Sequence, residues 1–293
     1  MFEKGVHRQL KLSYYPGCSL ESTAKEYDIS TRSVCEALGV KLVELKDWVC
    51  CGATSAHSTN HTLSVTLPAR NIALAQEHGK DLAVPCSACY NILKKADYAM
   101  RNDGAMRSQT EKTVGFDYDG SISILSLLEA IVTGVGAEAI AGKVKKPLTG
   151  LDVVCYYGCL LVRPPDITQF DNSENPTSLD NIISSLGARS IPWSYKTDCC
   201  GASLSLTSPD IVNKMVGRLL DAAREAGASA IVTACPLCQS NLEMRRAKKD
   251  AVLPSFYFTE LIGLALDLPG TDKWLKLHLI DPQPLLRSLS LQR

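Results

Sequence analysis

Cys50-Cys51-Gly52-Ala53 recurs later in the chain as Cys199-Cys200-Gly201-Ala202, and this repeated stretch decides how the fold is organised. In each copy one cysteine precedes the Cys-Cys pair and a C-x-x-C motif follows it. From the pair onward the cysteines recur 149 residues later, from 50 to 199, 51 to 200, 86 to 235 and 89 to 238, while the leading cysteine recurs after 141, from 18 to 159. We infer an internal duplication whose shared feature is a set of five thiols.

Length and composition indicate a two-domain globular protein. The chain has 293 residues, of which 45% are hydrophobic and 21% charged, and a domain takes about 150 residues. The net charge of zero gives no indication of a nucleic acid or an anionic membrane as partner. No apolar run approaches the roughly 18 residues that span a bilayer, and the first residues do not resemble a signal peptide. We therefore expect a cytoplasmic protein, in which twelve cysteines indicate metal binding or redox chemistry rather than structural disulfides.

Hydrophobic periodicity predicts alternating strands and helices in both halves. In the first half we expect strands over 10–16, 41–45 and 81–86 and helices over 26–38, 63–78 and 86–100, with Pro68 in the first turn of its helix or breaking it. In the second half we expect strands over 151–158, 190–195 and 229–235 and helices over 178–186, 209–226 and from 236 onward. This order predicts an α/β fold of two pseudo-twofold-related, Rossmann-like lobes, each a small, mainly parallel sheet flanked by helices. The cysteines follow the strands, and in such sheets ligands gather beyond the carboxyl ends of the strands.

The boundaries follow from the duplication. We expect a first domain over 10–142, a second over 150–268, a linker over 143–150 and a C-terminal tail over 269–293 that serves for docking. The polar stretch 101–120 is predicted to be rich in loops. The apolar segments 122–132 and 256–266 are predicted to be helices that lie in the core or at an interface with a partner subunit.

Four interpretations of the cysteines compete. The first interpretation is that the cysteines are small hydrophobic residues buried in the core. It suits Cys35 and Cys155, but it does not explain ten cysteines in two matching sets. Structural zinc takes four ligands, so one thiol of each five would be left over. A thioredoxin-like dithiol between a strand and a helix uses only two of the five. Iron–sulfur clusters take thiolate ligands, although the ferredoxin run of cysteines is absent. Ligand counting therefore favours iron–sulfur and leaves the cluster type open.

The pattern C-x31-CC-x34-C-x-x-C in the first half and C-x39-CC-x34-C-x-x-C in the second resembles the cysteine-rich CCG domain. The duplicated form, without a fused ferredoxin domain, is similar to the B subunit of heterodisulfide reductase. The stretches YYPGC, CCGA, YYGCLLVRPP and YKTDCCGASLSLT add to the match, which covers residues 10–268. Cys35 and Cys155 lie outside the pattern.

This resemblance implies that each half binds a non-cubane [4Fe-4S] cluster and that a disulfide is reduced between the two clusters by two one-electron transfers. In methanogens the substrate is the mixed disulfide of coenzyme M and coenzyme B, and bacterial relatives act on other disulfides. The implied partners are the ferredoxin-like protein and the electron-bifurcating flavoprotein of such a complex. An electron-relay subunit that does not itself reduce a disulfide remains the alternative. The implied ligands are Cys18, Cys50, Cys51, Cys86 and Cys89 in the first half and Cys159, Cys199, Cys200, Cys235 and Cys238 in the second.

A few other residues lie near the cysteines in sequence. Gly52 and Gly201 are expected to allow a tight turn and close approach of the backbone to a cluster. His57 and His61 follow the first CCGA stretch and could donate a proton to a product thiolate, but the second half has no equivalent histidines, which favours a surface or hydrogen-bonding role. Arg163 and Lys196 could bind an anionic group of the substrate, although solvated charges are the simpler interpretation.

Overall fold

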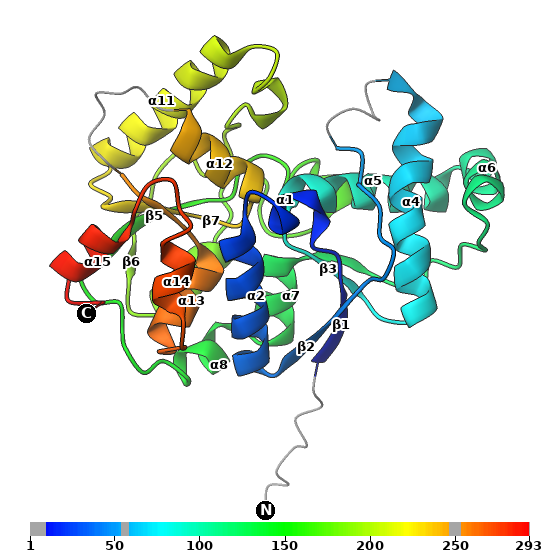
Figure 1. The fold of residues 1–293 in the computed structure, drawn as a ribbon. Helices are drawn as coiled ribbons and strands as arrows, with labels where there is room; N and C mark the ends of the chain where they lie inside the picture. The colour runs from blue at the N-terminus through cyan, green and yellow to red at the C-terminus, as the bar shows by residue number, and fades with distance from the viewer. Residues whose placement is uncertain (1–9, 54–58, 246–252, 293) are drawn as a thin grey trace, which may run out of the picture.

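The computed structural model describes residues 10–53, 59–245 and 253–292, and it contains two four-stranded sheets whose paired strands all run parallel (Figure 1). The strand order is β2-β1-β3-β4 in the first sheet and β6-β5-β7-β8 in the second, so the two sheets have the same topology. The strands are β1 (Leu10–Tyr14), β2 (Val40–Glu44), β3 (Leu82–Val84), β4 (Ile124–Ser126), β5 (Asp152–Tyr156), β6 (Arg189–Ser190), β7 (Ala230–Thr233) and β8 (Ser255–Tyr257). The predicted α/β fold of two related lobes is confirmed.

Helices connect and cover these strands. Those of the first half are α1 (Gly17–Glu21), α2 (Lys25–Leu38), α4 (His61–His78), α5 (Ser87–Asn102), α6 (Gly104–Val114), α7 (Leu127–Gly134) and α8 (Ala137–Ala141). Those of the second half are α9 (Pro165–Thr168), α10 (Ser178–Ser185), the short 3-10 helix η1 (Ala202–Leu204), α11 (Pro209–Glu225), α12 (Pro236–Met244), α13 (Phe258–Ala265), α14 (Thr271–Leu275) and α15 (Gln283–Ser288).

The two halves pack through α2 of the first half, which lies against α13 and α14 of the second (Figure 1). The Ser30 and Thr259 hydroxyl groups are hydrogen-bonded at 2.7 Å across this interface. The Tyr27 hydroxyl donates to the Ala234 carbonyl at 3.2 Å, and the Tyr27 ring is stacked on that of Tyr257 with centroids 4.1 Å apart. These buried polar and aromatic contacts fix how one half lies on the other.

Two sequence-based predictions about breakers and loops are wrong. α4 begins at His61, because the Asn60 side chain accepts from the Leu63 N–H, so Pro68 lies inside the helix and not in its first turn. The helix continues through this proline, which is buried. The stretch 101–120 is not loop-rich either, since it contains α6. The Asp103 carboxylate caps the start of that helix, and Gly115 ends it in the left-handed conformation.

The apolar segments 122–132 and 256–266 are not purely helical as predicted. Each begins with a three-residue strand, β4 or β8, and only then enters a helix, α7 or α13. The change occurs at Ser126, where Glu129 completes a capping box, and at Tyr257, whose N–H donates to Glu260 Oε2 at 2.9 Å. The strand predicted over 190–195 is also shorter than expected, because β6 ends at Ser190 and the next carbonyl of β5, that of Cys155, accepts from the Trp193 side chain instead of from a strand N–H.

The last residues of the chain lie against the second half and the interface. Trp274 of α14 packs so closely on α13 that a Cβ added at Gly263 would lie 2.5 Å from its ring. The His278 side chain that follows is fully buried between Glu243 and Glu260. The segment 143–150, expected as the linker, forms no helix or strand.

Candidate functional site

The cysteines lie at the point in each sheet where the strand order reverses. The chain passes from β1 to β2 on one side and then to β3 on the other, so β1 and β3 are neighbours whose carboxyl ends open a crevice between their loops. Cys18 follows β1 and Cys86 follows β3. In the second sheet Cys159 follows β5 and Cys235 follows β7. The two thiol sets therefore occupy the position at which open parallel sheets bind ligands.

Burial of the ten cysteines follows the duplication. In each half the second cysteine of the Cys-Cys pair and both cysteines of the C-x-x-C motif are buried. The first cysteine of each pair, Cys50 or Cys199, is exposed, and the leading cysteine is exposed in the first half and half-buried in the second. All ten thiols are free. Each set therefore reaches from the interior of its lobe to the surface.

Within each half the sulfur atoms lie close to one another. The Sγ atoms of Cys51 and Cys89 are 3.0 Å apart, and those of the equivalent Cys200 and Cys238 are 3.7 Å apart. The leading cysteine lies close enough to the first cysteine of the pair to influence its pKa or to be influenced by it, Cys18 with Cys50 and Cys159 with Cys199, and the two thiols of each C-x-x-C motif likewise influence one another. The structure thus brings together the five predicted residues of each set.

The two sets also meet. The Cys86 thiol of the first half lies close enough to the Cys235 thiol of the second to be influenced by it, and Cys235 is the largest influence on the Cys86 pKa, which it raises. Both residues are the N-caps of the helices that follow them, α5 and α12. The ten sulfurs therefore form one continuous group with this pair at its centre.

Both glycines after the Cys-Cys pairs form the tight turn that was predicted for them. Gly52 and Gly201 have φ angles of 78° and 77°, in the left-handed region that glycine adopts readily. In this conformation the Gly52 N–H donates to Cys50 Sγ at 3.4 Å, and the Gly201 N–H donates to Cys199 Sγ at 3.2 Å. Each turn therefore aims a backbone dipole at a sulfur, which favours the thiolate form.

Neighbouring thiols dominate the electrostatics of the site. A hydrogen bond from Cys89 lowers the pKa of Cys51 to about 7, and one from Cys159 lowers the pKa of Cys199 to about 6. Other thiols and burial raise the pKa of Cys238. Among the described residues no lysine or arginine ranks among the main influences on either set. Several buried thiolates side by side would therefore need a cationic group bound between them.

The donor set fits an iron–sulfur cluster better than one metal ion. Within the described ranges, no three His, Cys, Asp or Glu side chains are grouped as they would be around a single ion, because the thiols form a chain of pairwise contacts. A multi-iron cluster binds thiolates at separate irons. The backbone also leaves room for sulfur, since a Cβ added at Gly17 would lie 3.4 Å from Cys89 Sγ and one at Gly158 would lie 3.0 Å from Cys238 Sγ.

Two buried hydroxyl groups next to the central pair have no hydrogen-bond partner in the described part of the chain. They belong to Ser87, which follows Cys86, and Thr233, which lies two residues before Cys235. Buried hydroxyls are normally paired, so these two are available to a bound group. The buried Tyr27 ring also lies beside Cys86 and Cys235. Sequence analysis missed Tyr27, because it comes from α2, which carries no motif cysteine.

Lys196 is buried in an ion pair and is not a solvated charge, whereas Arg163 is paired within the protein but 37% exposed. The buried Lys196 ammonium donates to Asp180 Oδ2 at 3.1 Å and to the Pro176 carbonyl at 2.8 Å. The Arg163 guanidinium donates to Glu174 at 2.8 Å and to the Thr197 hydroxyl at 2.9 Å. Both residues tie down the segment that leads to the second Cys-Cys pair.

The exposed His61 and the two unmatched cysteines are not among the thiols grouped above. His61 is exposed in the first turn of α4, and His57 lies outside the described residues. Cys35 is buried on α2, where burial raises its pKa to about 12. Cys155 is fully buried in β5, and its sulfur lies 3.4 Å from the Ser190 hydroxyl. The interpretation of these two thiols as buried core residues agrees with their positions.

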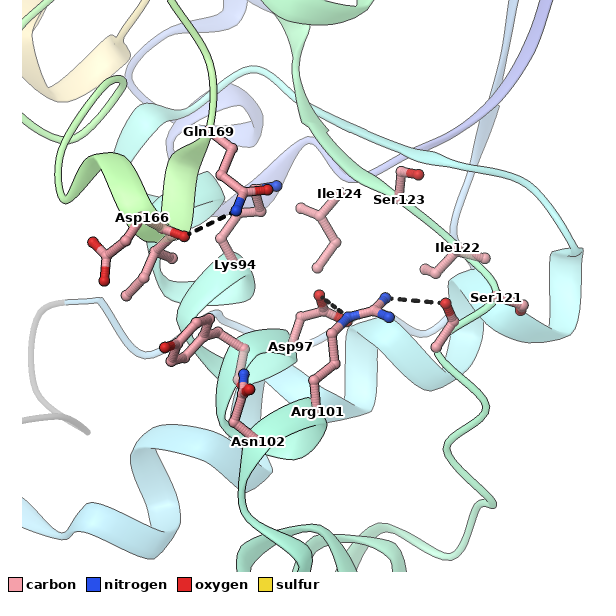
Figure 2. Close-up of a pocket in the computed structure, with 13 residues that line it drawn as sticks. Lys94, Asp97, Arg101, Asn102, Ser121, Ile122, Ser123, Ile124, Asp166 and Gln169 are labelled. Atoms are coloured by element: carbon pink, nitrogen blue, oxygen red, sulfur yellow. Dashed lines mark hydrogen bonds and ion pairs between the residues drawn. The ribbon is translucent and has the colours of Figure 1, made fainter.

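A polar pocket of about 550 Å³ lies elsewhere on the interface between the halves (Figure 2). It is bounded by α5, the segment 120–124 and α9 with Gln169. Figure 2 shows Arg101 extended along its wall, where the guanidinium donates to Asp97 at 2.8 Å and to the Gly120 carbonyl at 3.0 Å. None of the ten cysteines, all of which the structure describes, lines this pocket. A hollow of about 70 Å³ does lie against Cys199.

A family model described as a cysteine-rich domain, CCG, matches residues 12–94 and 153–243, which are the two cysteine-bearing parts of the duplication. The chain belongs to the CCG family. This CCG protein is 32% identical to the 8-methylmenaquinol:fumarate reductase membrane anchor subunit of Wolinella succinogenes, over 94% of this chain and 99% of that one. It is 28% identical to the B subunit of the ferredoxin/F420H2-dependent CoB-CoM heterodisulfide reductase of Methanosarcina acetivorans, over 87% and 89%. The predicted resemblance is confirmed.

A solved structure supports the fold of the CCG protein. A crystal structure of a hypothetical protein from Helicobacter pylori matches with a TM-score of 0.72 at 14% identity, over 92% of this chain. The chain spans 52% of the length of that protein. Lactate utilization protein A of Bacillus thuringiensis is a further relative, at 21% identity over 87% of this chain and 99% of its own length. Among the helices of the described residues, none combines the length and apolar character that crossing a membrane requires.

Proposed function

We propose that this CCG protein binds two iron–sulfur clusters of the non-cubane [4Fe-4S] type, one in each thiol set, and reduces a disulfide between them as part of a larger oxidoreductase. The observation that carries the proposal is the contact of Cys86 with Cys235, which joins two equivalent sets of free thiols across the interface. A disulfide has two sulfurs and takes two electrons and two protons to give two thiols. A site with two matching halves provides one set of ligands for each sulfur.

The chain contributes geometry to this reaction. Cys51, Cys86 and Cys89 and their counterparts are buried, so the inner part of the site is shielded from water, while Cys50 and Cys199 reach the surface. The Gly52 and Gly201 N–H groups orient the thiolates. When bound, such clusters transfer one electron at a time and offer iron as a Lewis acid. The interface contacts between α2 and α13 hold both sets at a fixed separation.

The relatives support work within a complex. The fumarate reductase and heterodisulfide reductase relatives are both named as subunits, and we propose two partners, a ferredoxin-like protein and a flavoprotein. Exposed apolar side chains follow the second Cys-Cys pair, where Leu206 is 94% exposed. Such side chains are typical of a surface that a partner covers.

A second candidate is an electron-relay subunit that feeds a partner and does not itself turn over a disulfide. The 32% identity to the fumarate reductase relative favours this function. Both candidates need the clusters, and they differ only in whether the chain reduces a disulfide itself.

The test begins with anaerobically purified protein. We expect about eight irons per chain and an EPR signal unlike that of a cubane. Cys51→Ser and Cys200→Ser should each remove the iron of one half, while the matched controls Cys35→Ser and Cys155→Ser should retain all of it. Reduction of a mixed disulfide with an artificial one-electron donor then separates the candidates. A chain without iron refutes both, and a chain with both clusters that does not reduce disulfides supports the relay.

A further inference from the structure

Tyr15 and Tyr156 occupy equivalent positions, each three residues before the leading cysteine of its half. The Tyr15 hydroxyl donates to the Val49 carbonyl at 2.9 Å. The Tyr156 hydroxyl donates to the Asp198 carbonyl at 2.7 Å. Val49 and Asp198 both directly precede a Cys-Cys pair. In each half, therefore, a tyrosine at the end of the first strand is hydrogen-bonded to the backbone just before the pair.

Both tyrosines also lie against the sulfurs of their own half. Burial raises the pKa of both. After burial, four thiols of the same half have the largest influence on the pKa of each tyrosine, and they stand at equivalent positions in the two halves. The strongest influence is the second cysteine of the C-x-x-C motif, and the next is the second cysteine of the Cys-Cys pair.

A glycine keeps this contact open in both halves. A Cβ added at Gly17 would lie 3.4 Å from the Tyr15 ring and 3.4 Å from Cys89 Sγ. A Cβ added at Gly158 would lie 3.9 Å from the Tyr156 ring and 3.0 Å from Cys238 Sγ. The glycine before the leading cysteine thus lies between the tyrosine and the last sulfur of the set, and a larger residue would fill that space.

We propose that Tyr15 and Tyr156 are positioning residues of the two thiol sets, each fixing the Cys-Cys pair of its half and the glycine turn that follows the pair. This inference rests on the proposed function and adds the spacing Tyr-x-x-Cys to the cysteine pattern. A phenol has one proton, and each hydroxyl donates it to the carbonyl before the pair. This bond holds the turn in which the Gly52 or Gly201 N–H donates to a sulfur of the pair. Because hydrogen bonds to cluster thiolates favour the reduced cluster, each tyrosine raises the reduction potential of its own cluster by holding that turn.

The chain offers a matched control for each tyrosine. Tyr14 is fully buried, and its hydroxyl donates to Asp28 at 2.8 Å. Tyr157 is fully buried, and its hydroxyl donates to Asp180 at 2.7 Å. Replacing either by phenylalanine removes a buried tyrosine hydroxyl and its hydrogen bond, one residue away from Tyr15 or Tyr156, but leaves the hydroxyl beside the sulfurs in place.

The experiment compares the iron content and the EPR-monitored redox titrations of the wild type with those of Tyr15→Phe, Tyr156→Phe and the controls Tyr14→Phe and Tyr157→Phe. We expect Tyr15→Phe to shift one of the two clusters to a more negative potential and Tyr156→Phe to shift the other. A tenfold change in the reduction equilibrium is about 59 mV for one electron. Loss of the iron of one half, confined to Tyr15→Phe or Tyr156→Phe, would support the same role.

Unchanged potentials and iron in Tyr15→Phe and Tyr156→Phe, or equal shifts in the controls, would overturn this proposal and leave the proposed function intact. A wild-type chain without iron would overturn the proposed function and this inference with it. The two failures are therefore distinguishable from the wild-type measurement alone.

Discussion

Replacing His278 with glutamine should lower the free energy of unfolding by about 3–5 kcal/mol, the usual cost of removing one partner from a buried ion pair. The His278 side chain is fully buried. Its Nδ1 lies 2.7 Å from Glu243 Oε1, and its Nε2 lies 2.9 Å from Glu260 Oε1. Both carboxylates are buried as well, with side chains 5% and 0% exposed. Without the imidazolium, two buried carboxylates would face each other with no cation between them.

The charge of His278 makes stability depend on pH. Burial alone would lower its pKa, but Glu260 and Glu243 outweigh this effect and raise the pKa from 6.5 to about 11. The stabilisation is therefore fully present below pH 6.5 and is lost as the pH rises through 11. Each pKa unit corresponds to about 1.4 kcal/mol, so between pH 7 and 9 this group should remove roughly 2–3 kcal/mol of stability.

One further group in this cluster is close enough to matter. Burial raises the pKa of Glu26, on α2, from 4.5 to about 7, and Glu260 adds to the effect. Because the buried carboxyl is harder to charge than the unfolded one, Glu26 makes the folded state less stable as the pH rises from 4.5 to about 7. Glu26 is half-titrated near pH 7, so between pH 8 and 9 its charge is nearly constant, and the difference in slope between the wild type and His278→Gln in that range reports His278.

The assay is urea denaturation followed by circular dichroism at pH 7, 8 and 9. The control is His78→Gln, the same substitution at a half-buried histidine whose ring nitrogen lies 3.4 Å from the Ser13 hydroxyl. We expect His78→Gln to keep the wild-type slope of stability against pH and His278→Gln to flatten it. If His278→Gln costs less than about 1 kcal/mol and keeps the wild-type slope, the imidazole is not the charged centre of this cluster.

Three further predictions concern the turn at the second pair, the interface and the buried lysine. Gly201→Ala should lower the stability measured by thermal unfolding by about 1–3 kcal/mol, because the φ angle of Gly201 is 77°. Gly217→Ala, in the middle of α11 where an added Cβ meets no other atom, should raise that stability by about 0.5–1 kcal/mol. A double-mutant cycle of Ser30→Ala and Thr259→Val should give a coupling energy of at least about 0.5 kcal/mol, and additive losses would show that their 2.7 Å contact does not hold the halves together. Lys196→Met should cost about 3 kcal/mol in denaturant titrations, and an unchanged midpoint would contradict a buried ion pair there.

The sequence predicted the elements whose signals are local. Alternation of apolar residues located β1, β5 and the helices between them, and the helix predicted over 26–38 ends at Leu38, where Gly39 adopts the left-handed conformation. The position of the thiols followed from parallel-sheet topology, because every motif cysteine comes after a strand. The errors arose where a local signal was misread. Asp103 and Gly115 delimit α6, and Ser126 with Glu129 forms the capping box that separates β4 from α7.

The cluster around His278 could not be predicted from the sequence. Its members come from α2, α12, α13 and the chain after α14, so only tertiary packing brings them together. A lone histidine among apolar residues carries no signal for two carboxylates that lie 18 and 35 residues away along the chain. The same holds for Tyr27, since no pattern in α2 indicates that its side chain reaches the thiols of the other half.

The paired tyrosines show how a repeat can be misaligned by its most visible letters. Both halves contain two adjacent tyrosines, and aligning YY with YY equates Tyr14 with Tyr156. Counting back from the leading cysteine equates Tyr15 with Tyr156 instead, and the structure agrees, because both donate to the carbonyl that precedes a Cys-Cys pair. Strand pairing gives the same result, since Tyr14 pairs with Ala83 and Cys155 pairs with Val232, which lies 149 residues after Ala83, from 83 to 232. Spacing to a chemically constrained residue is thus the better guide to equivalence, because the sulfurs and their hydrogen-bond donors must keep their geometry while the neighbouring positions are free to change.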